Sequence, residues 1–171
     1  MSVPLIEIVR ATVGLSIQDM GRTGTTAIGL SQGGAMDKLA LIEAAALLGQ
    51  THPSPAIEFM GVGGSLRVLC DMTVALTGGE MNAKVSDRVL QWNATHTLNA
   101  GDIIELSAPK SGVYGYVTPH AELATRARAH TRAQLVYIIL NEQVIYAQLD
   151  SPRPNLWTNR HGFRVQYIII M

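Results

Sequence analysis

Short apolar runs separated by turn residues fill the chain between residues 56 and 117 and constrain the fold more than any other feature. The runs are AIEFM, SLRVL, TVALT, AKV and RVLQW, and the segments between them are GVGG, CDM, GGE and SD. Further runs follow at IIEL and GVYGYV, while LVYIIL and QVIYAQL are typical of the two strands of a hairpin. Turns at this frequency indicate a barrel or a sandwich rather than alternating βα units. The sequence therefore predicts a mainly β chain.

One helix is predicted before the β region, and a second segment is a candidate. Residues Met36 to Leu48, MDKLALIEAAALL, are rich in Ala and Leu, and Gly49 follows as a C-cap. Asp37 lies where a carboxylate stabilises a helix N-terminus. The Ala- and Arg-rich stretch His120–Gln134 is the second candidate. The predicted fold class is mainly β with one or two helices.

Composition excludes several classes of protein. Thirteen basic residues balance thirteen acidic ones, so no net field attracts nucleic acid or an anionic membrane surface. Hydrophobic residues make up 47% of the 171 residues, which excludes a disordered chain and suits one domain with a full core. Cys70 is the only cysteine, and the sequence shows no signal peptide or apolar run of membrane-spanning length. We expect a cytoplasmic protein without nucleic-acid or membrane partners.

Motifs for metal and nucleotide binding are missing from the sequence. The five histidines lie far apart, and none has the i, i+4 helical spacing of a zinc motif, so no metal site is predicted. The glycine clusters match neither a Walker loop nor a G-x-G-x-x-G turn, and no serine lies in a G-x-S-x-G elbow. Function must therefore be sought in less specific features.

The stretch QDMGRTGTTAIGLSQGGAMD, from Gln18 to Asp37, is a loop that runs directly into the predicted helix. In a functional interpretation, the free amides at GGAMD bind a carboxylate or phosphate, and Arg22 clamps the same anion. In a structural interpretation, the glycines let the loop pass close to a barrel, and Arg22 pairs with Asp19 or Asp37. The residues alone favour the structural interpretation.

Two polar positions in the strands leave similar alternatives open. Glu58 lies among apolar residues in AIEFM, either pointing into a cavity as an acid or base or facing solvent, the commoner case. Thr77 and its neighbours Glu80 and Asn82, in LTGGEMN, suit a strand end beside a pocket, but a tight turn explains the glycines equally well.

Five segments, in the same order, resemble the biotin-dependent carboxyltransferase family, also called allophanate hydrolase subunit two, which includes KipA and the C subunit of bacterial 5-oxoprolinase. The family elements are T-x-Q-D-x-G-R-x-G, G-V-P-x-S-G-A-M-D, a helix ending in L-x-G-N, A-x-L-E, and L-T-G-A. They match SIQDMGRTG, GLSQGGAMD, the helix closing at LLGQ, AIE and LTGG in this chain. The resemblance covers roughly residues 5–117 and implies a cyclophilin-like β-barrel.

The resemblance also implies an organisation of the chain. Residues 1–118 form the carboxyltransferase-family, cyclophilin-like region. Residues 119–171 are a divergent C-terminal segment, which belongs to the same domain or begins a truncated second half. TPHAELATRARAHTRAQ stands where the family carries a Gly-Gly segment and a G-S-R-S-T element.

The function implied is a subunit of an ATP-dependent amidohydrolase that opens 5-oxoproline to glutamate with a partner of the KipI or B-subunit type. ATP is the cofactor of that complex, and biotin is a further candidate that this chain does not itself support. Non-catalytic regulation, as by KipA, and carboxyl transfer of the urea carboxylase type are the alternatives. The substrate is expected to be a small amide or carboxylate.

The candidate site residues are the polar and loop positions that match the family elements. The candidate catalytic residues are Asp19, Asp37 and Glu58; the candidate substrate-binding residues are Gln18, Arg22, Gly34, Ala35, Met36, Thr77 and Gly78.

Overall fold

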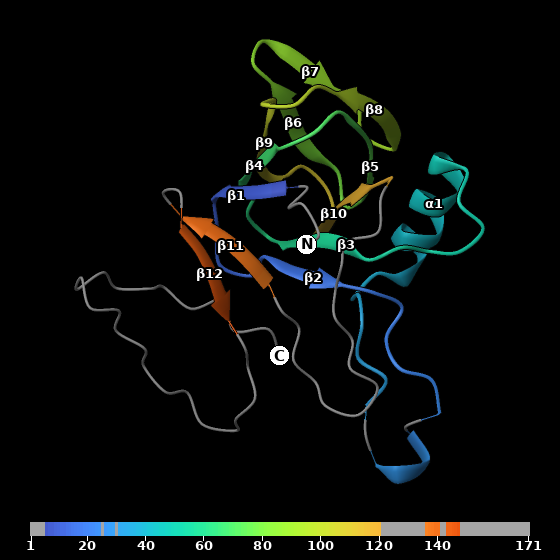
Figure 1. Cartoon of the computed structure of the whole chain (residues 1–171). Helices are drawn as coiled ribbons and strands as arrows, with labels where there is room; N and C mark the ends of the chain where they lie inside the picture. The colour runs from blue at the N-terminus through green and yellow to red at the C-terminus, as the bar shows by residue number, and fades with distance from the viewer. Residues whose placement is uncertain (1–5, 25, 30, 121–135, 141–142, 148–171) are drawn as a thin grey trace.

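A computed structural model describes residues 6–24, 26–29, 31–120, 136–140 and 143–147 (Figure 1). The chain forms one α-helix and a short 3-10 helix among its described strands. The elements in chain order are β1 Ile6–Arg10, β2 Ser16–Gln18, η1 Thr26–Ile28, α1 Lys38–Leu48, β3 Ala56–Met60, β4 Ser65–Val68, β5 Met72–Gly78, β6 Met81–Val85, β7 Arg88–Leu90, β8 Ala94–Leu98, β9 Ile103–Pro109, β10 Tyr114–Pro119, β11 Val136–Leu140 and β12 Gln143–Ala147.

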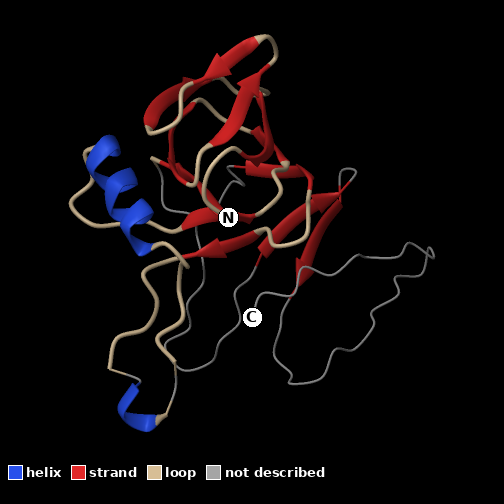
Figure 2. Ribbon diagram, turned by 180° about the vertical axis from the view of Figure 1, so that it is seen from behind, coloured by secondary structure: helices blue, strands red, loops and turns tan. Residues whose placement is uncertain are grey.

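Two five-stranded antiparallel sheets make up the main body. The first sheet has the strand order β1-β4-β9-β6-β7, and the second has the order β2-β3-β10-β5-β8. Figure 2 shows α1 lying beside the strands, outside the layer that they form. The predicted fold class, mainly β with one or two helices, is confirmed, and the described residues form two antiparallel sheets and one α-helix.

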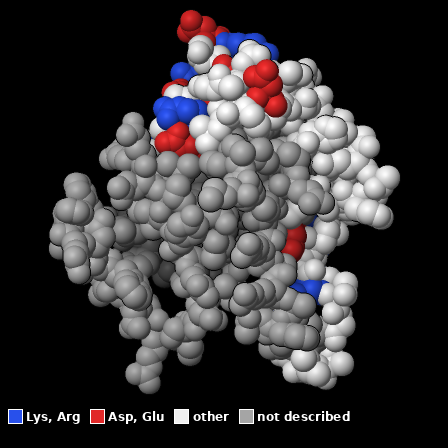
Figure 3. All heavy atoms as spheres, in the orientation of Figure 1, with Lys and Arg blue, Asp and Glu red and all other residues white. Residues whose placement is uncertain are grey.

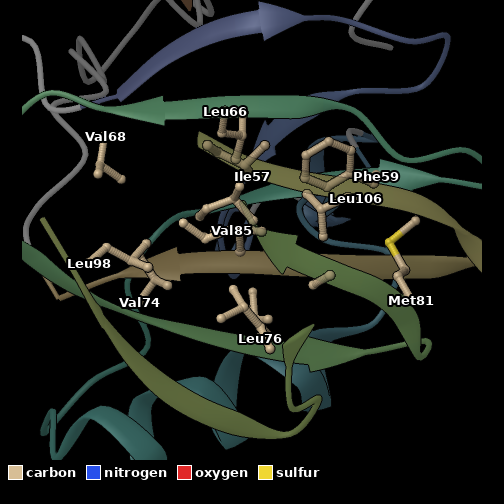
Figure 4. Close-up of a cluster of buried hydrophobic side chains, with 14 of the residues drawn as sticks. Ile57, Phe59, Leu66, Val68, Val74, Leu76, Met81, Val85, Leu98 and Leu106 are labelled. Carbon is tan, nitrogen blue, oxygen red and sulfur yellow. The ribbon is translucent and has the colours of Figure 1, made fainter. Parts of the chain in front are cut away.

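The main core lies between the sheets and follows from strand alternation. In β6, Met81, Ala83 and Val85 are buried while Asn82 and Lys84 are exposed. Side chains from both sheets point toward one another in Figure 4, among them Phe59, Leu66, Leu76 and Leu106. Alternation of this kind puts every second residue of a strand in the core, which is why the sequence pattern found these strands.

Helix α1 covers the outer face of the second sheet. It begins two residues later than predicted, after the N-cap Asp37, whose Oδ1 accepts from the amides of Leu39 at 3.1 Å and Ala40 at 3.3 Å. Gly49 ends it in the left-handed conformation at φ 67°, as predicted. Leu48 and Ala44 pack against Ala75 of β5. The small side chains at this contact bring the helix close to the sheet.

The last described elements form a hairpin. β11 and β12 pair in antiparallel register from Val136↔Ala147 to Leu140↔Gln143, which confirms the hairpin prediction. The second candidate helix, residues 120–134, falls almost wholly outside the described residues, and so does the end of the chain beyond residue 147. The proposed division at residue 118 stays a prediction. Among the described residues, no helix is long and apolar enough to cross a membrane.

Candidate functional site

A row of four polar side chains crosses the second sheet on the face that α1 covers. Cross-strand register pairs Ser16 with Glu58, Glu58 with Tyr116, and Tyr116 with Thr77. The row therefore runs over β2, β3, β10 and β5, and all four side chains are at most 8% exposed. Residues directly opposite on neighbouring strands point to the same side of a sheet. The structure thus joins two predicted site residues, Glu58 and Thr77, through Tyr116.

Glu58 is the centre of this row and is 4% exposed. Its Oε2 accepts from the Tyr116 hydroxyl at 2.7 Å and from the Met36 amide at 3.0 Å. Its Oε1 accepts from the Ser16 hydroxyl at 3.4 Å, and Gln18 Nε2 donates to Ser16 at 3.1 Å. A buried carboxylate is costly unless donors compensate it, and here the donors are hydroxyls and a backbone amide. The solvent-facing alternative for Glu58 is therefore wrong.

Tyr116 is a residue that the sequence did not single out. Its ring is fully buried, and its hydroxyl accepts from the Asp37 amide at 2.8 Å while donating to Glu58. Burial, together with the hydrogen bond to Glu58, raises the pKa of Tyr116 well above its usual value. The phenol stays protonated and remains a donor. GVYGYV gave no signal for this role, because the register that brings β10 against Glu58 is set by tertiary pairing.

The amides at the start of α1 are already engaged by protein acceptors. Met36 N–H donates to Glu58, Asp37 N–H to Tyr116, and the amides of Leu39 and Ala40 to the Asp37 carboxylate. The Ala35 amide donates to the Asp19 carbonyl at 2.8 Å. In the functional interpretation of the sequence, these amides bind an anionic ligand. In the structure, Glu58 and Asp37 supply negative charge at the positive end of the helix dipole.

The two arms of the 18–37 loop, residues 18–22 and 31–37, lie against each other. Arg22 N–H donates to the Gln32 carbonyl at 2.8 Å. A Cβ on Gly34 would lie 2.5 Å from the Gly21 nitrogen, and one on Gly21 would lie 2.4 Å from the Gly33 carbonyl oxygen. Side chains at these two glycines would force the arms apart. The loop itself extends away from the sheets and carries η1 at its far end (Figures 1 and 2).

Asp19 and Arg22 are the predicted charged residues that reach the surface of the loop. Asp19 Oδ1 accepts from the Gly21 amide at 2.7 Å, and Arg22 Nη1 donates to the Ser31 carbonyl at 3.4 Å. Asp19 is exposed and Arg22 is partly exposed. The ion pair that the structural interpretation gave Arg22, with Asp19 or Asp37, is not formed in the described part of the chain. Within the described residues, the Arg22 guanidinium makes this one hydrogen bond, to Ser31.

Thr77 and Gly78 border the buried tyrosine. Thr77 is fully buried, and its hydroxyl has no hydrogen-bond partner among the described residues. A Cβ on Gly78, which has φ 77°, would lie 2.7 Å from Cδ2 of the Tyr116 ring. Gly78 thus makes room for that ring, and its carbonyl accepts from Trp92 Nε1 at 3.0 Å. Thr77 is the last member of the row of polar side chains and Gly78 adjoins it, which a tight turn alone would not require.

Charge is unevenly distributed around this site. Figure 3 shows charged side chains gathered at the upper end of the molecule, while the described surface to the right is mostly uncharged. Lys84 pairs with Glu105 at 2.9 Å and Lys110 with Glu80 at 3.1 Å, away from the row. Within the described residues, no group of three or more His, Cys, Asp or Glu side chains is placed to hold a metal ion. Chemistry here rests on hydrogen bonds and a few charges.

The sequence matches a known family. The model of the family described as "Carboxyltransferase domain, subdomain A and B" matches residues 28–136, so this chain belongs to that family. The matched segment contains Met36, Asp37, Glu58, Thr77 and Tyr116. The hydrogen-bonded row and the start of α1 therefore lie almost entirely within the family domain, and the resemblance found in the sequence is confirmed.

Individual relatives agree with the family match. The chain is 35% identical over 113 residues to the 5-oxoprolinase C subunit of Haemophilus influenzae and 30% identical over 113 residues to the Escherichia coli protein of the same name. These matches cover 66% of this chain but only 37% and 36% of the relatives. The crystal structure of K. lactis urea amidolyase matches with a TM-score of 0.64 and 27% identity, over 67% of this chain and 7% of that protein. The chain thus spans little more than a third of the curated relatives' length.

Proposed function

We propose that this chain is a subunit of a cytoplasmic, ATP-dependent amidohydrolase that opens 5-oxoproline to glutamate, acting with a KipI-like or B-type partner. The observation that carries the proposal is the 35% identity to a protein named as the C subunit of 5-oxoprolinase. That name also describes one part of a multi-subunit enzyme, which supports a partner subunit. In this proposal, the exposed groups of the loop contact the substrate, and the groups engaged in hydrogen bonds within the protein hold the loop in place.

The exposed arm of the loop is suited to meet the substrate. The substrate is a cyclic amide that carries a carboxylate, and the partly exposed Arg22 supplies a planar fork of donors for such an anion. Asp19, exposed on the same arm, is the candidate acid or base. In the net reaction, the oxygen of water bonds to the amide carbonyl carbon and the C–N bond of the ring breaks. The nitrogen takes up a proton from the water and stays on the product as its amine.

The buried Glu58 and the partly exposed Asp37 have supporting roles in this proposal. Glu58 accepts three hydrogen bonds from protein donors, and Asp37 caps α1. Groups so engaged hold the loop in place but are poorly placed to exchange protons with a ligand. We therefore move Glu58 and Asp37 from the catalytic set to the positioning set, and keep Asp19 and Arg22 in contact with substrate.

The nucleotide does not fit the described residues of this chain. A triphosphate needs a cradle of free amides and cations, but the amides at the start of α1 already donate to Glu58, Tyr116 and Asp37. We assign the binding of ATP to the partner subunit.

The test is 5-oxoproline-dependent ATP hydrolysis by the chain mixed with its cognate partner subunit, with glutamate measured as the product. Arg22→Ala is expected to lower kcat/KM for 5-oxoproline about tenfold or more, mainly through KM, because charged hydrogen bonds to the substrate are lost. Arg88→Ala is the matched control, since Arg88 also donates one 3.4 Å bond to a carbonyl, that of Thr97, but lies on β7. No turnover, or equal effects of the two variants, would overturn the proposal.

Carboxyl transfer is the second candidate function, because the structural match to urea amidolyase extends over the same domain. It predicts that carboxyl groups move between carboxylated biotin and a small amide in the presence of the chain. Nothing in the described residues marks a biotin site. Transfer above background that is lost in Arg22→Ala would favour this function over ring opening.

A non-catalytic regulatory subunit is the third candidate. It is favoured by the engagement of Glu58 and Asp37 in hydrogen bonds within the protein. It predicts that the chain co-purifies with a KipI-like partner but binds no small amide in calorimetry. Binding of 5-oxoproline to the complex that is weakened by Arg22→Ala would argue against it.

A further inference from the structure

Three segments that are distant in sequence meet at one oxygen atom, the hydroxyl of Tyr116. Glu58 on β3, 58 residues away, accepts a hydrogen bond from this hydroxyl, and the amide of Asp37, 79 residues away, donates one to the same oxygen. A phenol has one proton to donate and lone pairs to accept, so both contacts are satisfied together. The amide of an N-cap residue has no partner within the helix, and here a side chain from the sheet accepts its hydrogen bond.

The contacts continue from this oxygen into the loop. The Met36 amide shares the Glu58 carboxylate with Tyr116, and the neighbouring Ala35 amide donates to the Asp19 carbonyl. Beyond Asp19, the Arg22 amide donates to the Gln32 carbonyl and closes the two arms on each other. Hydrogen bonds linked by short stretches of backbone thus connect the sheet to the backbone of Arg22.

We propose that Tyr116 is a positioning residue whose hydroxyl fixes the start of α1 on the second sheet and thereby sets where Asp19 and Arg22 stand. The ring and the hydroxyl have separable roles. The ring fills the space that Gly78 leaves open, while the hydroxyl alone contacts Glu58 and Asp37. The positioning is a property of this chain; its effect on turnover rests on the proposed function.

The same strand offers a matched control. Tyr114 lies two residues away on β10, is partly buried and packs against the cluster that contains Tyr116. Its side chain makes no hydrogen bond within the described part of the chain. Tyr116→Phe and Tyr114→Phe therefore delete the same atom from the same strand, and only the first deletion removes contacts to the loop and helix.

Hydrogen exchange measured by mass spectrometry tests the proposal on the full chain. Tyr116→Phe is expected to speed exchange of the amides in residues 32–40 about tenfold, with β5 and β6 unchanged, because a local anchor is lost. Glu58→Gln is expected to give the same local pattern. Tyr114→Phe should exchange like the wild type. Equal exchange in residues 32–40 for the two Phe variants, or a uniform rise along the chain, would overturn the proposal.

A kinetic readout separates this inference from the proposed function. If ring opening takes place with the partner subunit, Tyr116→Phe should lower kcat about tenfold while Tyr114→Phe leaves it unchanged. Complete absence of turnover in the wild-type complex would sink the proposed function, and the exchange data would still decide on positioning. Normal kcat in Tyr116→Phe, beside faster exchange in residues 32–40, would overturn the link from position to turnover.

Discussion

Alternate residues of the same strands give the two faces of the second sheet different roles: one face forms the core, and the other supports α1 and the loop before it. The inner face of β5 presents Val74 and Leu76 to the core between the sheets, while its outer face presents Ala75 and Thr77 toward α1. The buried side chains of the inner face are apolar and stabilise the fold by burial. The outer face combines small residues with a row of polar groups. The inner face stabilises the fold, and the outer face holds the loop in a defined position.

The largest expected effect tests the inner face. Leu76→Ala removes a fully buried side chain from the inner face of β5 and should lower the free energy of unfolding by about 2–5 kcal/mol. Leu39→Ala is the matched control, because Leu39 is 61% exposed on α1 and should change stability little. Urea denaturation followed by circular dichroism measures both. A similar loss in the two variants would mean that the core does not lie between the sheets.

The next effect tests the outer face. Glu58→Ala leaves the Tyr116 hydroxyl and the Met36 amide without their acceptor, and we expect a loss of about 2 kcal/mol or more in the free energy of unfolding. Glu105→Ala is the control, since Glu105 is half-exposed and, among the described residues, forms its ion pair with Lys84 at the surface. The same denaturation experiment applies. A stable Glu58→Ala variant would show that the row contributes nothing to folding.

A smaller effect concerns the helix that the outer face supports. Asp37→Ala removes the N-cap acceptor for Leu39 and Ala40 and should cost about 1 kcal/mol. Asp37→Ser should recover most of it. Asp87→Ala changes an exposed aspartate in the turn after β6 and serves as the control. Thermal denaturation compares the variants. Equal midpoints for Asp37→Ala and wild type would contradict the cap.

The smallest effect is a pH dependence. Since the pKa of Tyr116 is raised on folding, the unfolded chain loses this proton first as pH rises above about 10, which lowers stability. Below that pH both states keep the proton, and the contribution is constant. The stability advantage of wild type over Tyr116→Phe should shrink by about 0.8 kcal/mol near pH ~10.5. A pH-independent difference in urea denaturation would contradict a raised pKa.

The inner face was predictable from sequence because it depends on local pattern. Short apolar runs between turn residues located β3 to β7, β9 and β10, and Ala-rich composition with Asp37 and Gly49 located α1 to within two residues. The loop glycines indicated a close backbone contact, although the contact at Gly21 and Gly34 is between the two arms of the loop. These features need no knowledge of which strands pair.

The outer face could not be read in the same way. Glu58 looks like any polar residue on a half-exposed strand until the order β2-β3-β10-β5 places Tyr116 and Ser16 on either side of it. Those partners come from distant parts of the sequence. Family motifs pointed to Glu58 and Thr77 but not to the tyrosine between them. The assignment of catalytic and substrate-binding roles stays a prediction, because geometry shows contacts and not turnover.

A double-mutant cycle on Glu58 and Tyr116 tests most directly the claim that the row acts as a unit. The free energies of unfolding of wild type, Glu58→Gln, Tyr116→Phe and the double variant give the coupling between the two side chains. Their 2.7 Å hydrogen bond predicts a coupling of about 1–3 kcal/mol. Effects that add to within about 0.3–0.5 kcal/mol would contradict the account, because independent residues would not hold the loop together.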